Sequence, residues 1–175
     1  MGRLATLTIN DLTETQKTKY LASPMPRGDK IRGPAAAWLR SPDMFEHLAA
    51  MIMFFRDRSV LGPRLCEFAI LIVIAEWNAS YPWALHARLA KDAGLAPDII
   101  QALSARRAPD FQNEDERAVY AFSAELREKH AVSDATYQAA LRHFGEQGVV
   151  ELTALLGFYV LTCMTTNVLE MSPQD

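Results

Sequence analysis

An uninterrupted apolar run from Phe68 to Ala75 is the feature that most constrains how this chain folds. The run lies in the stretch from Pro63 to Trp77, where a proline start and the lack of strand-like alternation predict a helix. A helix without a polar face has to be covered by other elements on every side. Because such cover is difficult to achieve in one helical domain of 175 residues, we expect a homo-oligomer.

The rest of the chain from Pro34 onward divides into helices at its glycines and prolines. The pattern predicts helices over about 34–39, 42–58, 63–77, 80–93, 97–105, 113–129, 133–144 and 147–169. Asn113 with Glu116 three residues later has the spacing of a capping box, and Ser133 is expected to cap the next helix. No stretch alternates with a period of two strongly enough to compete with these signals. The sequence therefore predicts an all-α fold.

The first part of the chain differs from the rest in its polar composition. Residues 1–33 mix Thr, Lys and Asp with other side chains and show no apolar period. We therefore predict a polar N-terminal arm over 1–33, which takes no part in the core, and one helical domain over 34–175.

Charge and composition exclude several classes of protein. The chain carries 18 Lys and Arg against 21 Asp and Glu, and it has no basic block of the kind that follows a phosphate backbone. The apolar run ends at Glu76, far short of the ~20 residues that span a bilayer, and no signal-like leader opens the chain. Cys66 and Cys163 form neither a disulfide framework nor a zinc pattern. We expect a cytoplasmic protein that binds no nucleic acid, membrane or metal.

Two titratable side chains fall on apolar helix faces. Glu67 shares its face with Ile70 and Ile74, and His86 shares its face with Leu89 and other apolar residues of the following helix. An inward carboxylate is costly unless it is paired. Because a short loop joins the two helices, we expect them to be antiparallel neighbours that bring Glu67 within hydrogen-bond reach of His86.

Each of these residues also has a purely structural explanation. A single inward histidine is more often a satisfied core residue than a catalyst, and Glu67 could simply pair with Arg64 or with a group across a subunit contact. Tyr81 and Trp83 stand at a helix start, where aromatic side chains more often pack than contact a substrate. The residues alone therefore leave a catalytic and a structural interpretation open.

The segments Arg64-Leu-Cys-Glu67-Phe-Ala-Ile-Leu and Tyr81-Pro-Trp83-Ala-Leu-His86 resemble the carboxymuconolactone decarboxylase and alkylhydroperoxidase D superfamily. The similarity extends over about residues 34–170. The superfamily is all-helical and assembles into trimers or hexamers. The resemblance therefore implies an alkylhydroperoxidase D-like (AhpD-like) helical bundle that forms a homotrimer or a homohexamer.

The peroxidase branch of this superfamily carries the motif Glu-x11-Cys-x2-Cys-x3-His, in which two thiols reduce the peroxide. Glu67 and His86 match the acidic and histidine positions of this motif. The two cysteine positions are occupied by Ala79 and Pro82, which cannot form a thiolate. The chain is therefore similar to a member that lacks the redox pair.

The decarboxylase branch needs no cofactor, because a positioned acid or base manages the proton while the substrate loses carbon dioxide. The resemblance implies a cofactor-independent lyase or proton-transfer enzyme for a small carboxylated lactone or ring-derived acid, of the kind met in aromatic catabolism. His86 is the expected general acid/base and Glu67 its partner, and Tyr81, Trp83 and Arg64 are the expected substrate contacts. A peroxide-reducing enzyme and a non-catalytic helical oligomer that binds a small ligand are the alternatives.

Overall fold

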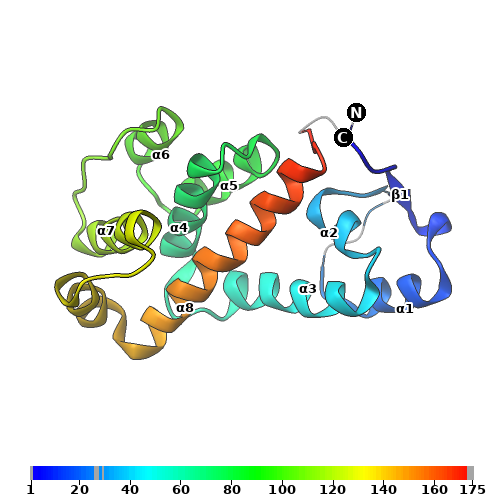
Figure 1. Cartoon of the computed structure of the whole chain (residues 1–175), viewed down its shortest axis with the longest axis horizontal. Helices are drawn as coiled ribbons and strands as arrows, with labels where there is room; N and C mark the ends of the chain where they lie inside the picture. Colours follow the sequence, from blue (N-terminus) through cyan, green and yellow to red (C-terminus); the bar gives the residue numbers. More distant parts are fainter. Residues whose placement is uncertain (1, 26–27, 29, 173–175) are drawn as a thin grey trace.

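The computed structural model describes residues 2–25, 28 and 30–172. Within these residues the chain forms eight α-helices and one two-stranded antiparallel ladder (Figure 1). The helices are α1 (Glu14–Ala22), α2 (Gly33–Trp38), α3 (Pro42–Asp57), α4 (Gly62–Glu76), α5 (Ser80–Asp92), α6 (Pro97–Ser104), α7 (Glu114–Lys129) and α8 (Asp134–Val168). The predicted all-α fold is confirmed, and the helix boundaries from α2 onward agree with the expected ones to within two residues. The last two expected helices follow each other in α8, with a kink between them at Gly145.

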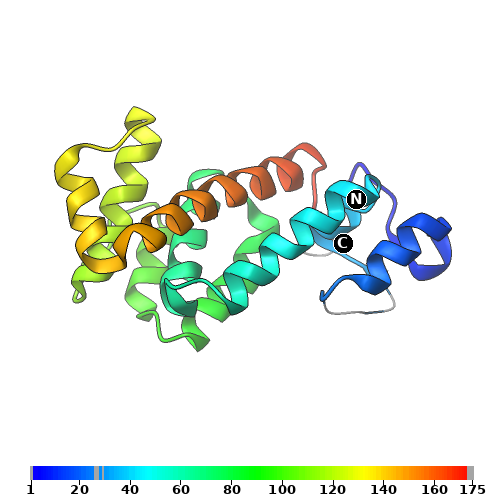
Figure 2. The ribbon, with the colours of Figure 1, turned by 90° about the horizontal axis from the view of Figure 1, so that it is seen from below.

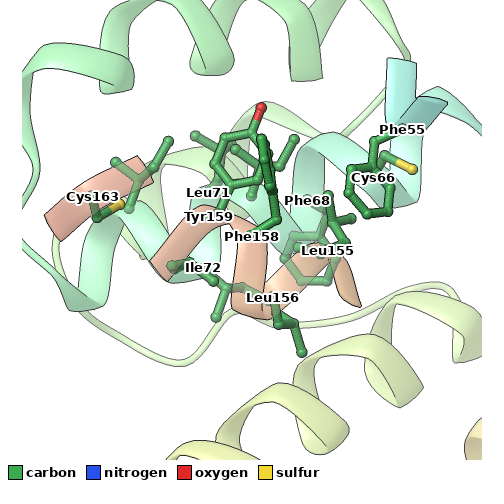
Figure 3. Packing of buried hydrophobic residues seen from close by; sticks show 14 of the residues in the cluster. Phe55, Cys66, Phe68, Leu71, Ile72, Leu155, Leu156, Phe158, Tyr159 and Cys163 are labelled. Carbon is green, nitrogen blue, oxygen red and sulfur yellow. The ribbon is translucent and has the colours of Figure 1, made fainter. Parts of the chain in front are cut away.

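Helix α4 lies at the centre of the bundle and is covered by its own chain. It packs against α3, α5, α6, α7 and α8, and nine of its side chains between Leu65 and Ile74 are buried. Figure 3 shows Leu71 and Ile72 of α4 packed beside Leu155 and Leu156 of α8. The expectation that this helix needs a second subunit to cover it is therefore wrong. The cover comes from α3, which precedes α4, and from helices as far along the chain as α8, and the local pattern does not reveal these contacts.

The last helix, α8, is long and apolar because it forms one wall of the core. It contains an 18-residue window with a mean hydropathy of 1.6, which by length and composition alone would suffice for a membrane span. In this structure 56% of that window is buried, mainly against α4 and α7. Gly145, with φ 66° and ψ 178°, interrupts the helix, at the point where the sequence predicts that one helix ends and the next begins.

The N-terminal segment is folded onto the helical domain. Strands β1 (Leu7–Thr8) and β2 (Lys30–Ile31) pair with each other, and α1 packs on α3. Leu12, Tyr20 and Ile31 are buried and belong to the core. The expectation that 1–33 takes no part in the core is therefore wrong for these residues. The three apolar side chains are too far apart in sequence to form a period, and they meet the core only after the segment folds back.

The two ends of the described chain lie close together in both views (Figures 1 and 2). The backbone N–H of Arg3 donates to the carbonyl of Leu169 at 2.9 Å, and its guanidinium pairs with Glu170 at 2.6 Å. These contacts hold the N-terminal segment to the end of α8.

The helix caps agree with the sequence at one of the two expected places. Ser133 caps α8, since its hydroxyl accepts from the N–H of Thr136. Asn113 precedes α7 but makes no side-chain cap, and the expected capping box is absent. The reason is that the Glu116 carboxylate pairs with Arg64 instead of turning back to the helix start.

Candidate active site

Glu67 of α4 and His86 of α5 lie in direct contact. The two helices run side by side because Trp77 to Ala79 form a tight connection between them. The Glu67 Oε2 atom is 2.7 Å from the His86 Nδ1 atom, and the two side chains are 13% and 11% exposed. The geometry expected for antiparallel neighbours is therefore present, and the buried carboxylate has a partner.

The second ring nitrogen of His86 faces Tyr159 of α8. The Tyr159 hydroxyl lies 3.5 Å from His86 Nε2, and the two rings meet edge to face at 90°. Burial, with a smaller contribution from Glu67, raises the pKa of Tyr159 well above its ordinary value. The phenol is therefore neutral at physiological pH and can donate a hydrogen bond.

Tyr159 was not identified as a site residue from the sequence, where it counts only as one apolar residue of the last helix. One signal was available. A phenol hydroxyl inside an otherwise apolar stretch needs a polar partner when it is buried. That rule predicts some partner for Tyr159 but does not indicate that the partner is His86, which lies 73 residues away in the sequence.

A large cavity of about 1140 Å³ opens beside this cluster. Glu67, His86 and Tyr159 all line it. Its walls are mostly apolar and include Ile52, Phe55, Ile70, Leu85, Leu89 and Phe158. A concave apolar site with a few converging polar groups is the usual form of a small-molecule site. The arrangement can therefore hold an organic molecule against the Nε2 atom of His86.

The three expected substrate contacts have different positions. Tyr81 lines the cavity, whereas Trp83 lines a separate, smaller cavity of about 140 Å³. Residues two apart on a helix point to opposite sides, so one helix start cannot present both rings to one site. Arg64 is not among the lining residues described, because its guanidinium pairs with Asp115 at 2.5 Å and with Glu116. The structure therefore brings Tyr81 to the site but not Trp83 or Arg64.

Both thiols are buried and lie apart from each other. Cys66 is 3% exposed and Cys163 is fully buried. Burial raises the pKa of both thiols, that of Cys163 to about 12. Figure 3 shows the two sulfur atoms on opposite sides of Phe158 and Tyr159. At neutral pH both groups are thiols, and they do not form a redox pair.

Comparisons with known proteins identify the fold. No family model matches the chain, and no curated protein matches it either. Among solved structures, the chain is similar to the crystal structure of an Agrobacterium tumefaciens protein of unknown function, described as a candidate antioxidant defence protein AhpD. The TM-score is 0.67 at 18% identity, and the match covers 81% of this chain and 97% of that one. At this identity the likeness shows the fold alone, and the chain has the all-α AhpD-like fold.

Proposed function

We propose that this protein is a cofactor-independent enzyme that transfers a proton to or from an organic acid, with His86 as the general acid/base. A carboxylated lactone or ring-derived acid is the proposed substrate. One observation carries the proposal. The contact between Glu67 and Nδ1 of His86 leaves the other ring nitrogen, Nε2, without a carboxylate partner among the residues that the structure describes, and the residue lines a large, mostly apolar cavity. A structural histidine requires partners but does not require such a cavity.

The pair has the geometry for proton transfer. When the Glu67 carboxylate accepts the Nδ1 proton, the imidazole is held in the tautomer that has a lone pair on Nε2. Nε2 then takes a proton from the substrate, and Glu67 stabilises the resulting imidazolium. The Tyr159 hydroxyl, 3.5 Å from Nε2, is placed to donate to an oxygen that gains negative charge.

In a decarboxylation, His86 starts as the protonated imidazolium. The bond between the substrate carbon and its carboxylate breaks, carbon dioxide leaves, and the electron pair moves into the conjugated lactone. The imidazolium of His86 then delivers its Nε2 proton to the carbon that carries the charge, and the neutral imidazole regains a proton from solvent. The chain needs no other group for this balance of atoms and charge.

A peroxide-reducing enzyme is a weaker candidate. The description of the structural neighbour suggests it, but Ala79 and Pro82 stand at the positions where the redox pair would be. Cys66 and Cys163 are buried, with pKa values raised by burial, and cannot replace that pair at neutral pH.

The test compares two single variants, His86→Ala and His47→Ala. His47 is exposed on α3 and does not line the cavity, so it is the matched control. We expect His86→Ala to keep a melting temperature near that of the parent and to lose ~10²–10⁴-fold in turnover of carboxylated lactones and related ring acids. His47→Ala should change neither quantity.

Three results would contradict the proposal. A folded His86→Ala protein that turns over its substrate as fast as the parent would exclude an acid/base role. A His86→Ala protein that loses its fold, at the ~3–5 kcal/mol that an unpaired buried carboxylate costs, would make the pair structural. A parent protein that binds these acids without converting them would favour the non-catalytic binding protein.

A further inference from the structure

The cavity beside His86 has a floor and a rim that differ in chemistry. The floor is formed by buried lining residues, which include Cys66, Pro82, His86, Phe158 and Tyr159. Lining residues that are also exposed stand where the cavity meets solvent. The charged residues among them are Lys30, Arg32 and Arg56.

The charged residues described at this rim all carry the same sign of charge. Among the described lining residues, Glu67 is the single acidic side chain, and it contacts His86 on the floor. Arg56 pairs with its neighbour Asp57 at 2.9 Å, whereas Lys30 and Arg32 have no ion-pair partner among the described residues. The whole chain carries a formal charge of −3, so a cationic rim departs from its general composition. Two cations with no ion-pair partner in the described part of the chain, at the mouth of a cavity, favour an anionic ligand.

The fold fixes the position of these two cations. Ile31, between them, is 3% exposed and pairs with Leu7 across the ladder. Because side chains alternate along an extended chain, Lys30 and Arg32 point away from the buried side of Ile31. Gly33 follows with φ +64°, and a Cβ atom there would lie 2.7 Å from the Tyr81 hydroxyl. The segment that carries the cations is thus packed directly against α5, the helix of His86.

The size and lining of the cavity indicate what the ligand carries besides its anionic group. Its volume of about 1140 Å³ exceeds the ~300–1,000 Å³ of ordinary small-molecule sites. Its walls are mostly apolar up to the rim, where Leu85 is 49% exposed. An acid with a single ring would leave much of this apolar surface in contact with water.

We propose that the N-terminal segment forms an acid-binding rim through Lys30 and Arg32, and that the ligand is an amphipathic organic acid whose apolar body is larger than one ring. The carboxylate lies at the rim, and the apolar body extends toward His86 and Tyr159. This inference rests on the proposed function for the choice of a carboxylate, and it assigns substrate selection to a segment that lies outside the helical bundle.

The experiment titrates the full chain in a calorimeter with three probes: 4-biphenylacetate, its uncharged amide, and phenylacetate. We expect the biphenyl acid to bind about 10-fold more tightly than the amide, because hydrogen bonds to charged groups add that much affinity. Phenylacetate should bind more weakly than the biphenyl acid, because it buries less apolar surface. The preference for acid over amide should decrease with added salt.

The double variant Lys30→Gln/Arg32→Gln should bind acid and amide equally. Arg88→Gln/Lys91→Gln is the matched control, because it removes the same charge from exposed positions of α5 outside the described lining. An amide that binds the parent as tightly as the acid would overturn the inference, as would a control that loses the preference equally. Equal affinity for phenylacetate would refute the large apolar body.

A His86→Ala variant separates this inference from the proposed function. We expect it to keep the parent's preference for 4-biphenylacetate over the amide, since His86 does not hold the carboxylate. Charge-dependent binding to a parent that turns over no acid would refute the proposed reaction and support the acid-binding rim. If the parent turns over acids but its preference for acid over amide does not depend on Lys30 and Arg32, the proposed reaction is supported and the acid-binding rim is refuted.

Discussion

The two nitrogen atoms of His86 have different surroundings, and the proposed mechanism gives each a separate role. Nδ1 contacts a carboxylate at 2.7 Å, whereas Nε2 lies 3.5 Å from the hydroxyl of Tyr159, which lines the cavity together with His86. At this distance the hydroxyl is a weak partner of the imidazole, which leaves it available to a bound molecule. We therefore expect Tyr159 to assist turnover and to contribute little to stability.

Tyr159→Phe tests this role at the scale of one atom. The variant keeps the ring that meets His86 edge to face, so the melting temperature should stay near that of the parent. Loss of one neutral hydrogen bond of ~0.5–1.5 kcal/mol in the transition state should lower kcat by ~2- to 10-fold. Tyr120→Phe, outside the described lining, is the control. An unchanged kcat would remove Tyr159 from the mechanism.

The two cysteines should be slow to react in the folded protein. Because burial raises the pKa of Cys66, and that of Cys163 to about 12, the thiolate fraction at pH 8 is smaller than in an exposed cysteine. A disulfide reagent such as DTNB should label the native protein slowly at pH 8, faster as the pH rises, and rapidly in urea. Fast labelling of the native protein at pH 7 would contradict this expectation and would support a reaction that uses one of the thiols.

At the scale of helices, Arg64 joins α4 to α7 through Asp115 and Glu116. The Glu116 side chain is only 2% exposed, so its carboxylate depends on this partner. Arg64→Met should therefore lower the free energy of unfolding by ~3 kcal/mol, measured by urea denaturation, with KM unchanged. The double variant Arg64→Met/Glu116→Gln should recover part of the loss. If Arg64→Met instead raises KM and leaves the free energy of unfolding unchanged, Arg64 is a substrate contact, as the sequence predicts.

The junction between the N-terminal segment and α5 depends on Gly33. An alanine at a positive φ costs ~1–2 kcal/mol, and at Gly33 its Cβ would also collide with the Tyr81 ring. Gly94 has φ +91° with open space around it, so Gly94→Ala carries the backbone cost alone. Thermal unfolding should show that Gly33→Ala is the more destabilising of the two. Equal losses would mean that Tyr81 moves freely, and the junction would not be rigid.

At the scale of the whole molecule, the apolar surface still favours assembly, although α4 no longer supports it. Leu161, Met164 and Val168 are exposed at spacings of three and four residues along one side of α8. We expect light scattering to give a mass of at least twice the 19.6 kDa chain, with a trimer or hexamer as the proposed state. A stable monomer at micromolar concentration would contradict this expectation.

The sequence by itself determined the helices and brought two site residues together. Prolines, glycines and apolar periods act over a few residues, so the boundaries from α2 onward agree with the structure. The contact between Glu67 and His86 could also be predicted from the sequence, because one short connection between two helices places these residues side by side.

Only the tertiary structure decided the rest of the site. Tyr159 reaches His86 from 73 residues away, and Arg64 meets Glu116 across 52 residues. Lys30 and Arg32 come to the cavity from a segment whose composition placed it outside the core. The physical reason is that local signals specify which residues form a helix and which face is apolar, but not which distant helix covers that face. The cover of α4, the partner of Arg64 and the rim of the cavity all depend on that choice.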